Sequence, residues 1–149
     1  METSAEPPGH EAWRLMAEMM LSHDSMDRLH NACAAADVTP PLLKALMSLG
    51  PGQAWPMSVL AKGWRCDASW VTGIVDGLEE RGYVQRRTLE TDRRVKLVEI
   101  TEGGEAARAK ALDVLFDPPP SINSLSAKDQ LALRNIMRKV RVAEPRGVC

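Results

Sequence analysis

The hydrophobic period of this sequence changes abruptly at Gly82, and that change constrains the fold more than any other feature. Residues 68–81 place apolar side chains at i, i+3, i+4 and i+7, which predicts a helix with one buried face, and the carboxylate of Asp67 can cap its first turn. Residues 83–100 then form two short β-branched or alternating segments on either side of the polar stretch Thr88–Arg94. This pattern predicts a hairpin with a loop of about seven residues. The buried face of the helix consists of Val71, Ile74, Val75 and Leu78.

Helices are predicted on the N-terminal side of this unit. Helical spacing without Gly or Pro runs from about His10 to Ala36, with apolar residues on two flanks of one long helix. Thr39 followed by Pro40 is a cap-then-proline helix start. A further short helix is expected over Pro56–Lys62, with Val59, Leu60 and Trp64 turned inward.

Helices are predicted on the C-terminal side as well. A second long helix begins after Thr101 and ends at Asp117, because three prolines follow. Ser126, with Asp129 three residues later, resembles a capping box that starts a last helix. The expected fold is therefore mainly α-helical with one small β-hairpin.

Composition and charge exclude several classes of protein. The 149 residues carry a net charge of -1, which excludes a polycation that holds nucleic acid by bulk charge. Three cysteines, at positions 33, 66 and 149, are too few and too widely spaced for a disulfide scaffold or a zinc ribbon. No apolar run approaches the roughly 18 to 20 residues needed to span a bilayer, and the polar N-terminus is no secretory signal. We expect a soluble, cytoplasmic protein without a membrane partner.

Three short helices followed by a hairpin is the order of a winged helix-turn-helix. In that motif the second helix of the pair places its N-terminal side chains against base edges in the major groove of DNA. The outward positions near the start of the 68–81 helix are therefore candidate DNA contacts, with Trp70 as a surface or core aromatic in the alternative. These positions are Ser69, Trp70, Thr72 and Gly73.

The hairpin is the basic part of this otherwise slightly acidic chain. Between Tyr83 and Lys96 there are five basic residues and two acidic ones. An arginine at the tip of a narrow loop can enter the minor groove, where the negative potential is enhanced. A solvated charge run is the alternative. The candidate DNA contacts in the hairpin are Arg86, Arg93 and Arg94.

Residues 38–105 resemble the MarR family of bacterial transcriptional regulators. The resemblance is carried by Asp67-Ala68-Ser69-Trp70-Val71-Thr72, by Leu78-Glu79-Glu80-Arg81-Gly82-Tyr83-Val84, by Asp92-Arg93-Arg94 and by Ile100-Thr101. It implies a homodimer built from the N- and C-terminal helices, with two DNA-binding lobes. It also implies that Asp92 braces the wing while Arg94 acts at the minor groove, and a carboxylate two residues before an arginine can orient it by a charge-assisted bond.

The chain departs from the family pattern at two glycines. Family members usually carry a basic residue after the threonine, where this chain has Gly73, and often another at the position of Gly77. Each glycine within a helix costs about 1 kcal/mol relative to alanine. Either the operator is bound weakly, or the wing and Arg65 compensate.

The predicted domain organisation follows from these assignments. Residues 1–9 form a disordered tail, residues 10–142 a single domain and residues 143–149 a second tail. Within the domain, residues 10–36 and 102–142 are dimerisation helices and residues 38–101 the winged helix-turn-helix lobe.

One face of the N-terminal helix carries residues suited to a ligand. Aromatic and methionine walls with a few polar groups suit a small-molecule effector pocket, and dimer-core packing is the alternative. The candidate pocket residues are Trp13, Met16, Met20, His23 and Asp27. His23, Asp27 and His30 have metal-ligand side chains, but three ligands from one helix cannot chelate tightly, so we expect no metal and no cofactor.

Cys66 is the candidate redox residue. It follows Arg65 and precedes a helix N-terminus, and both features lower the pKa of a thiol. Buried packing is the alternative, and Cys33 on an apolar stripe is the weaker candidate. No catalytic constellation is present, so we expect no enzyme.

The sequence therefore predicts a homodimeric, sequence-specific DNA-binding transcriptional regulator. We expect a repressor that binds a palindromic operator in double-stranded DNA and is released by a small-molecule effector. The alternatives are a redox-sensing regulator that uses Cys66 or Cys33, and a winged-helix adaptor that binds protein instead of DNA.

Overall fold

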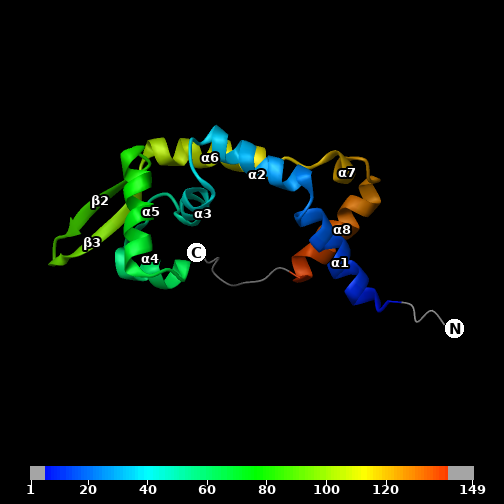
Figure 1. Ribbon diagram of the computed structural model, residues 1–149, viewed down its shortest axis with the longest axis horizontal. Helices are drawn as coiled ribbons and strands as arrows, with labels where there is room; N and C mark the ends of the chain where they lie inside the picture. The colour runs from blue at the N-terminus through cyan, green and yellow to red at the C-terminus, as the bar shows by residue number, and fades with distance from the viewer. Residues whose placement is uncertain (1–5, 141–149) are drawn as a thin grey trace.

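The computed structural model describes residues 6–140, which fold into an arch of helices with a small sheet at one end (Figure 1). The helices and strands are α1 (Pro8–Met20), α2 (His23–Ala35), α3 (Pro40–Ser48), β1 (Ala54–Pro56), α4 (Met57–Trp64), α5 (Ala68–Glu80), β2 (Val84–Leu89), β3 (Asp92–Ile100), α6 (Glu102–Phe116), α7 (Pro120–Asn123) and α8 (Ala127–Val140). The mainly α-helical winged helix-turn-helix fold is confirmed.

Helices α3, α4 and α5 and the sheet form a lobe around one apolar core. The predicted face of α5 is buried, and Leu43, Leu46 and Leu49 from α3 and its C-terminus pack with it. Trp64 and Leu60 turn inward as predicted, whereas Val59 is 43% exposed. The core fixes α5 by one side and leaves the other side to solvent.

The sheet has three antiparallel strands in the order β1-β3-β2. The sequence predicts only β2 and β3 and not β1. In β1, Trp55 pairs with Val98 of β3. The predicted seven-residue hairpin loop is also wrong, because β2 continues to Leu89 and β3 begins at Asp92. The extension pairs Thr88 with Lys96 and Leu89 with Asp92, with a register shift between Thr88 and Leu89.

The predicted single helix over residues 10–36 is two helices. α1 ends at Met20, and Ser22 caps α2 by accepting a hydrogen bond of 3.2 Å from the backbone amide of Ser25. The hydroxyls of Ser22 and Ser25 also donate to the carbonyl oxygen of Met19, at 2.8 and 2.6 Å. α1 starts at Pro8, so the last two residues of the predicted disordered tail (residues 1–9) are helical. Residues 1–5 and the predicted tail at 143–149 lie outside the described residues.

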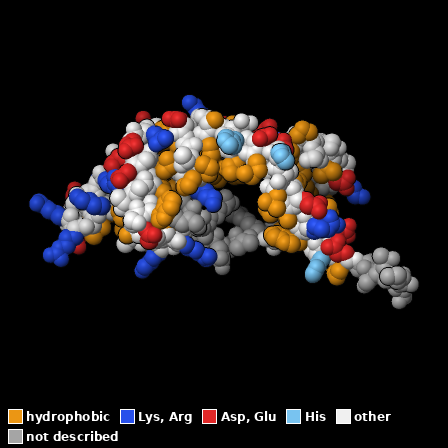
Figure 2. Space-filling view, in the orientation of Figure 1, with side chains coloured by type: hydrophobic (Ala, Val, Ile, Leu, Met, Phe, Trp, Pro, Cys, Tyr) orange, Lys and Arg blue, Asp and Glu red, His pale blue; other side chains and the backbone are white. Residues whose placement is uncertain are grey.

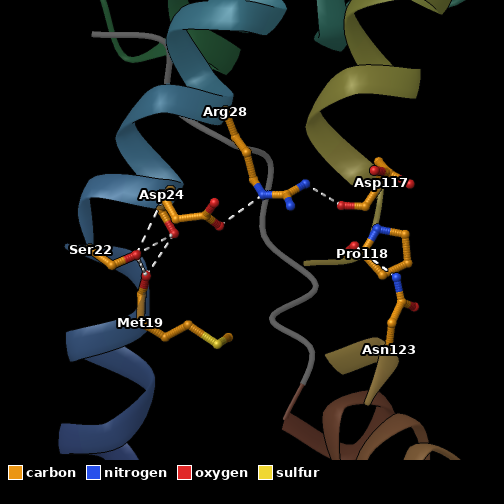
Figure 3. Close-up of polar contacts among 8 residues, drawn as sticks. Met19, Ser22, Asp24, Arg28, Asp117, Pro118 and Asn123 are labelled. Atoms are coloured by element: carbon orange, nitrogen blue, oxygen red, sulfur yellow. Dashed lines mark hydrogen bonds and ion pairs between the residues drawn. The ribbon is translucent and has the colours of Figure 1, made fainter. Parts of the chain in front are cut away.

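A second helix break, after α6, lies beside the break between α1 and α2. α6 packs along α2 and ends before Asp117, where the prolines stop it as predicted. Arg28 of α2 donates to the carbonyl oxygen of Asp117 and pairs with Asp24 at 3.0 Å (Figure 3). Asn123 donates to the carbonyl oxygen of Pro118 at 3.1 Å. Arg28 thus ties α2, close to its first turn, to the chain just after α6.

Helices α1, α7 and α8, which all lie within the described residues, contain no buried residue. The predicted cap of α8 is confirmed, because Ser126 accepts a hydrogen bond from the amide of Asp129 at 3.1 Å. The large side chains that these helices expose include Trp13, Leu15, Met19, Met20, Leu131, Ile136, Met137 and Val140. Within residues 6–140, none of the helices combines the length and apolar character that crossing a bilayer requires.

Candidate nucleic-acid interface

The first turn of α5 is held by Asp67, as predicted. Its Oδ1 atom accepts hydrogen bonds from the hydroxyl of Ser69 at 2.6 Å and from the backbone amide of Trp70 at 2.9 Å. These bonds, that from Ser69 first, hold the pKa of the Asp67 carboxyl below its ordinary value. The helix start is therefore rigid while its outer surface stays open.

All four predicted contact positions on α5 are exposed. Trp70 is 57% exposed, which excludes the alternative of a core aromatic. The hydroxyl of Thr72 donates to the carbonyl oxygen of Ala68 at 2.9 Å, so its oxygen remains available as an acceptor. A side chain at Gly73 would meet no atom within 4 Å, and this position is an open notch beside Trp70.

The wing tip is the turn at residues 90–91, followed by Asp92. Asp92 braces this turn by accepting a hydrogen bond of 3.0 Å from the backbone amide of Arg94. The bond therefore fixes the backbone of Arg94, where we expected a bond to its guanidinium. Arg93 and Arg94 are exposed, and Figure 2 shows Lys and Arg side chains gathered at the end of the β2–β3 hairpin.

Arg86, a predicted DNA contact, is held by two carboxylates in this structure, and its contact with DNA stays a prediction. Its guanidinium pairs with Glu79 and, at 2.5 Å, with Asp76, both on α5. The neighbouring Arg87 pairs with Glu99 at 3.2 Å. The basic surface of the hairpin is therefore concentrated at its tip.

The sequence profile of the MarR family matches residues 38–96, the segment that holds α3, α4, α5 and nearly all of the hairpin. Over residues 38–96 the chain is therefore similar to the MarR family. The uncharacterized HTH-type transcriptional regulator YfiV of Bacillus subtilis (strain 168) is 35% identical over 69 residues, which cover 46% of this chain and 43% of YfiV. The match therefore spans less than half of that relative.

Solved structures of the MarR fold resemble this chain over most of its length. Wild-type MarR from E. coli in its apo form superposes with a TM-score of 0.70 at 24% identity, covering 92% of this chain and 98% of that one. The MepR–DNA complex from S. aureus gives a TM-score of 0.67 at 17% identity, covering 83% and 93%. These likenesses show the fold.

Arg65 and Cys66 lie where the lobe turns from α4 into α5. Arg65 adopts the left-handed conformation, with φ of 57°, and is exposed. Cys66 is half-buried, with its Sγ atom 3.4 Å from the carbonyl oxygen of Trp64. Contact of Arg65 with DNA and oxidation of Cys66 stay predictions. Cys33 is buried, and burial raises the pKa of its thiol, which opposes the reactive thiolate form.

The predicted effector residues lie on two helices, α1 and α2. Trp13 and Met20 are 62% and 55% exposed, and the helix break at Ser22 separates them from His23 and Asp27. An effector site at these residues stays a prediction. In the part of the chain that the structure describes, no three or more His, Cys, Asp or Glu side chains come together as a metal site.

A pocket lies instead between the lobe and the long helices. It holds about 600 Å³ and is mainly apolar. The indole of Trp64 is fixed in its wall by donating a 2.8 Å hydrogen bond to Ser48. No local sequence pattern predicts this pocket, because its walls come from four helices and one strand. Its lining includes Leu29, Met47, Trp55, Trp64 and Leu115.

Proposed function

We propose that this chain is a sequence-specific DNA-binding transcriptional regulator of the MarR family, acting on double-stranded DNA in the cytoplasm. The observation that carries the proposal is the pairing of two open surfaces on one rigid lobe. The capped N-terminus of α5 is exposed, and the wing tip beside it presents Arg93 and Arg94. The solved DNA complex of MepR, which has this fold, supports the same use of the surface.

The two surfaces suit adjacent grooves of a duplex. The N-terminal residues of α5 enter the major groove, where Ser69 and Thr72 contact phosphates or base edges and Trp70 lies against a thymine methyl group. Arg94 enters the minor groove, held by the turn that Asp92 braces. Gly73 stands where members of the MarR family usually carry a basic residue, so α5 lacks that positive charge. The wing therefore supplies much of the electrostatic attraction to DNA.

A second copy of the chain completes the molecule. α1 and α8 expose large apolar side chains and bury none within this chain, and surfaces of this kind are covered by a partner in soluble proteins. In Figure 2, hydrophobic side chains also line the inner side of the arch. A homodimer presents two α5 helices to half-sites about 34 Å apart on a palindromic operator.

The pocket of Leu29 and Trp64 is the proposed effector site, and the protein a repressor. A ligand there contacts both the lobe and helices α2 and α6, so it favours one orientation of the lobe over others. Release from DNA then requires that the ligand bind the two orientations with different affinity. The lining is almost wholly apolar, which suits a small, largely apolar molecule.

The test begins with selection of bound sequences from random DNA, followed by affinity measurements over a series of salt concentrations. We expect a palindromic consensus and an affinity that falls steeply with salt. Arg94→Ala should weaken binding at fixed salt, while the exposed Lys128→Ala on α8, far from the wing, should not. Absence of any selected sequence would favour the protein-binding adaptor, and equal affinity of the two variants would remove the wing from the proposal.

A further inference from the structure

Arg86 lies on β2 at the junction of the wing and α5. There it faces two carboxylates of α5 that the proposed function does not explain. Ser69 and Thr72 begin one face of α5, and Asp76 and Glu79 continue that face at i+7 and i+10 from Ser69. The surface proposed to approach DNA thus ends in two carboxylates. Each of them repels the phosphate backbone unless a cation neutralises it.

Arg86 reaches both carboxylates from the neighbouring strand. Its guanidinium donates to Oε2 of Glu79 and to Oδ1 of Asp76, the latter at 2.5 Å. Its backbone amide donates to Oε1 of Glu79 at 3.1 Å, so Glu79 receives two bonds from one residue. A longer contact of 3.5 Å reaches the carbonyl oxygen of Thr72.

Burial distinguishes Arg86 from the other arginines of the hairpin. Its side chain is 23% exposed, against 52% for Asp76 and 41% for Glu79. The two carboxylates engage both terminal nitrogens of the guanidinium, which leaves little of its surface for a phosphate. The planar fork of arginine can serve two carboxylates at once, whereas the ammonium of lysine acts as a single point charge.

We propose that Arg86 is a positioning residue that masks Asp76 and Glu79 from the phosphate backbone and thereby lets the duplex lie against α5. This inference rests on the proposed function, because it concerns the same DNA-binding surface. It assigns to Arg86 an intramolecular role in place of the direct DNA contact that the sequence suggested.

The test compares four variants at fixed salt, with DNA selected by the wild-type protein. Arg86→Ala uncovers two negative charges near the backbone, so we expect about tenfold weaker binding. Arg86→Lys should lose most of the same affinity. Asp76→Asn with Glu79→Gln keeps the hydrogen-bond acceptors and removes the charges, so it should bind as well as wild type or more tightly. Adding these two substitutions to Arg86→Ala should restore the affinity to within about threefold of wild type.

A direct phosphate contact gives a different pattern, because lysine also binds phosphate. Wild-type affinity in Arg86→Lys, or no recovery in the triple variant, would overturn the inference. Weaker binding by Asp76→Asn with Glu79→Gln would overturn it as well. Because this variant retains Arg86, it still tests the inference when Arg86→Ala fails to fold. In the protein without DNA, the backbone amide at position 86 donates to Glu79. Its hydrogen exchange should be faster in Arg86→Lys than in wild type, because lysine holds Glu79 less firmly. If wild type binds no DNA at all, the proposed function fails first and the masking role with it.

Discussion

The phenolic hydroxyl of Tyr83 donates a hydrogen bond of 2.8 Å to the backbone carbonyl oxygen of Ala36, which lies 47 residues earlier in the chain. The bond joins the base of the wing to the end of α2. Tyr83→Phe leaves that part-buried carbonyl without its partner, so we expect a loss of about 1 kcal/mol in the free energy of unfolding. Urea denaturation measures it. Glu90→Gln, at the exposed tip of the wing, is the control, and an equal effect of both would show that the bond contributes nothing.

Gly104 lies where α6 begins, and no side chain fits there. A Cβ atom would lie 2.0 Å from the carbonyl oxygen of Tyr83 and 2.8 Å from Cγ1 of Ile100. Gly104→Ala should therefore lower the free energy of unfolding by roughly 3 kcal/mol, as overpacking does in tight cores. Thermal unfolding of the variant would contradict the prediction if the midpoint stayed at the wild-type temperature.

Gly73 is the matched contrast, because a Cβ atom there meets nothing within 4 Å. Gly73→Ala should raise the free energy of unfolding by about 1 kcal/mol through helix propensity alone. At Gly77, a Cβ atom would lie 3.2 Å from both methyl carbons of Leu42, so the gain should be smaller there. A loss of stability in Gly73→Ala would mean that this glycine has a structural role.

The capping carboxylate of Asp67 makes stability depend on pH in the acid range. Its hydrogen bonds hold its pKa below the ordinary value of 3.8, so the folded state favours the charged form. The contribution is present above the unfolded pKa and is lost as pH falls through the lower, folded pKa. Asp67→Asn retains a capping acceptor that does not titrate. Urea midpoints measured from pH 7 to pH 2 should fall more steeply for wild type than for Asp67→Asn, and parallel curves would refute this assignment.

The exposed apolar face of α8 predicts the oligomeric state. Ile136 is 56% exposed in the single chain, and a charge there would be buried without a partner in a dimer. Ile136→Glu should therefore shift the protein from dimer to monomer by analytical ultracentrifugation, whereas Asn135→Glu, at the adjacent exposed polar position, should leave the dimer intact. A wild-type protein that sediments as a monomer would contradict the proposed homodimer.

Local signals in the sequence predicted the lobe well. Asp67 and Gly82 fix the ends of α5 through their own backbone and side-chain chemistry, and the apolar spacing between them identifies its buried face. Distant pairings were missed. β1 has three residues and is defined by its partner Val98 and the neighbouring rungs of β3, and no local pattern announces such a strand.

Several features of the candidate site depend on distant contacts in the same way. Arg86 was grouped with the exposed arginines of the wing, because sequence shows its charge and not the two carboxylates that face it from α5. Ser22 lay within a continuous helical spacing, and its capping role depends on the chain leaving the helix at Leu21. The apolar pocket escaped for a related reason, since Leu29 and Leu115 meet there from helices far apart in the sequence.

The break at Ser22 and the break at Asp117, which Arg28 ties to α2, give the arch the geometry of a lever. α6 has 15 residues and therefore extends about 22 Å from that fulcrum toward the sheet. A rotation of roughly 10° at the breaks displaces its far end by roughly 4 Å, more than the rise of about 3.4 Å between successive bases on one strand. For the proposed DNA-binding lobe, a small angular change at Ser22 and Asp117 is thus enough to shift the lobe by more than one base step along the duplex.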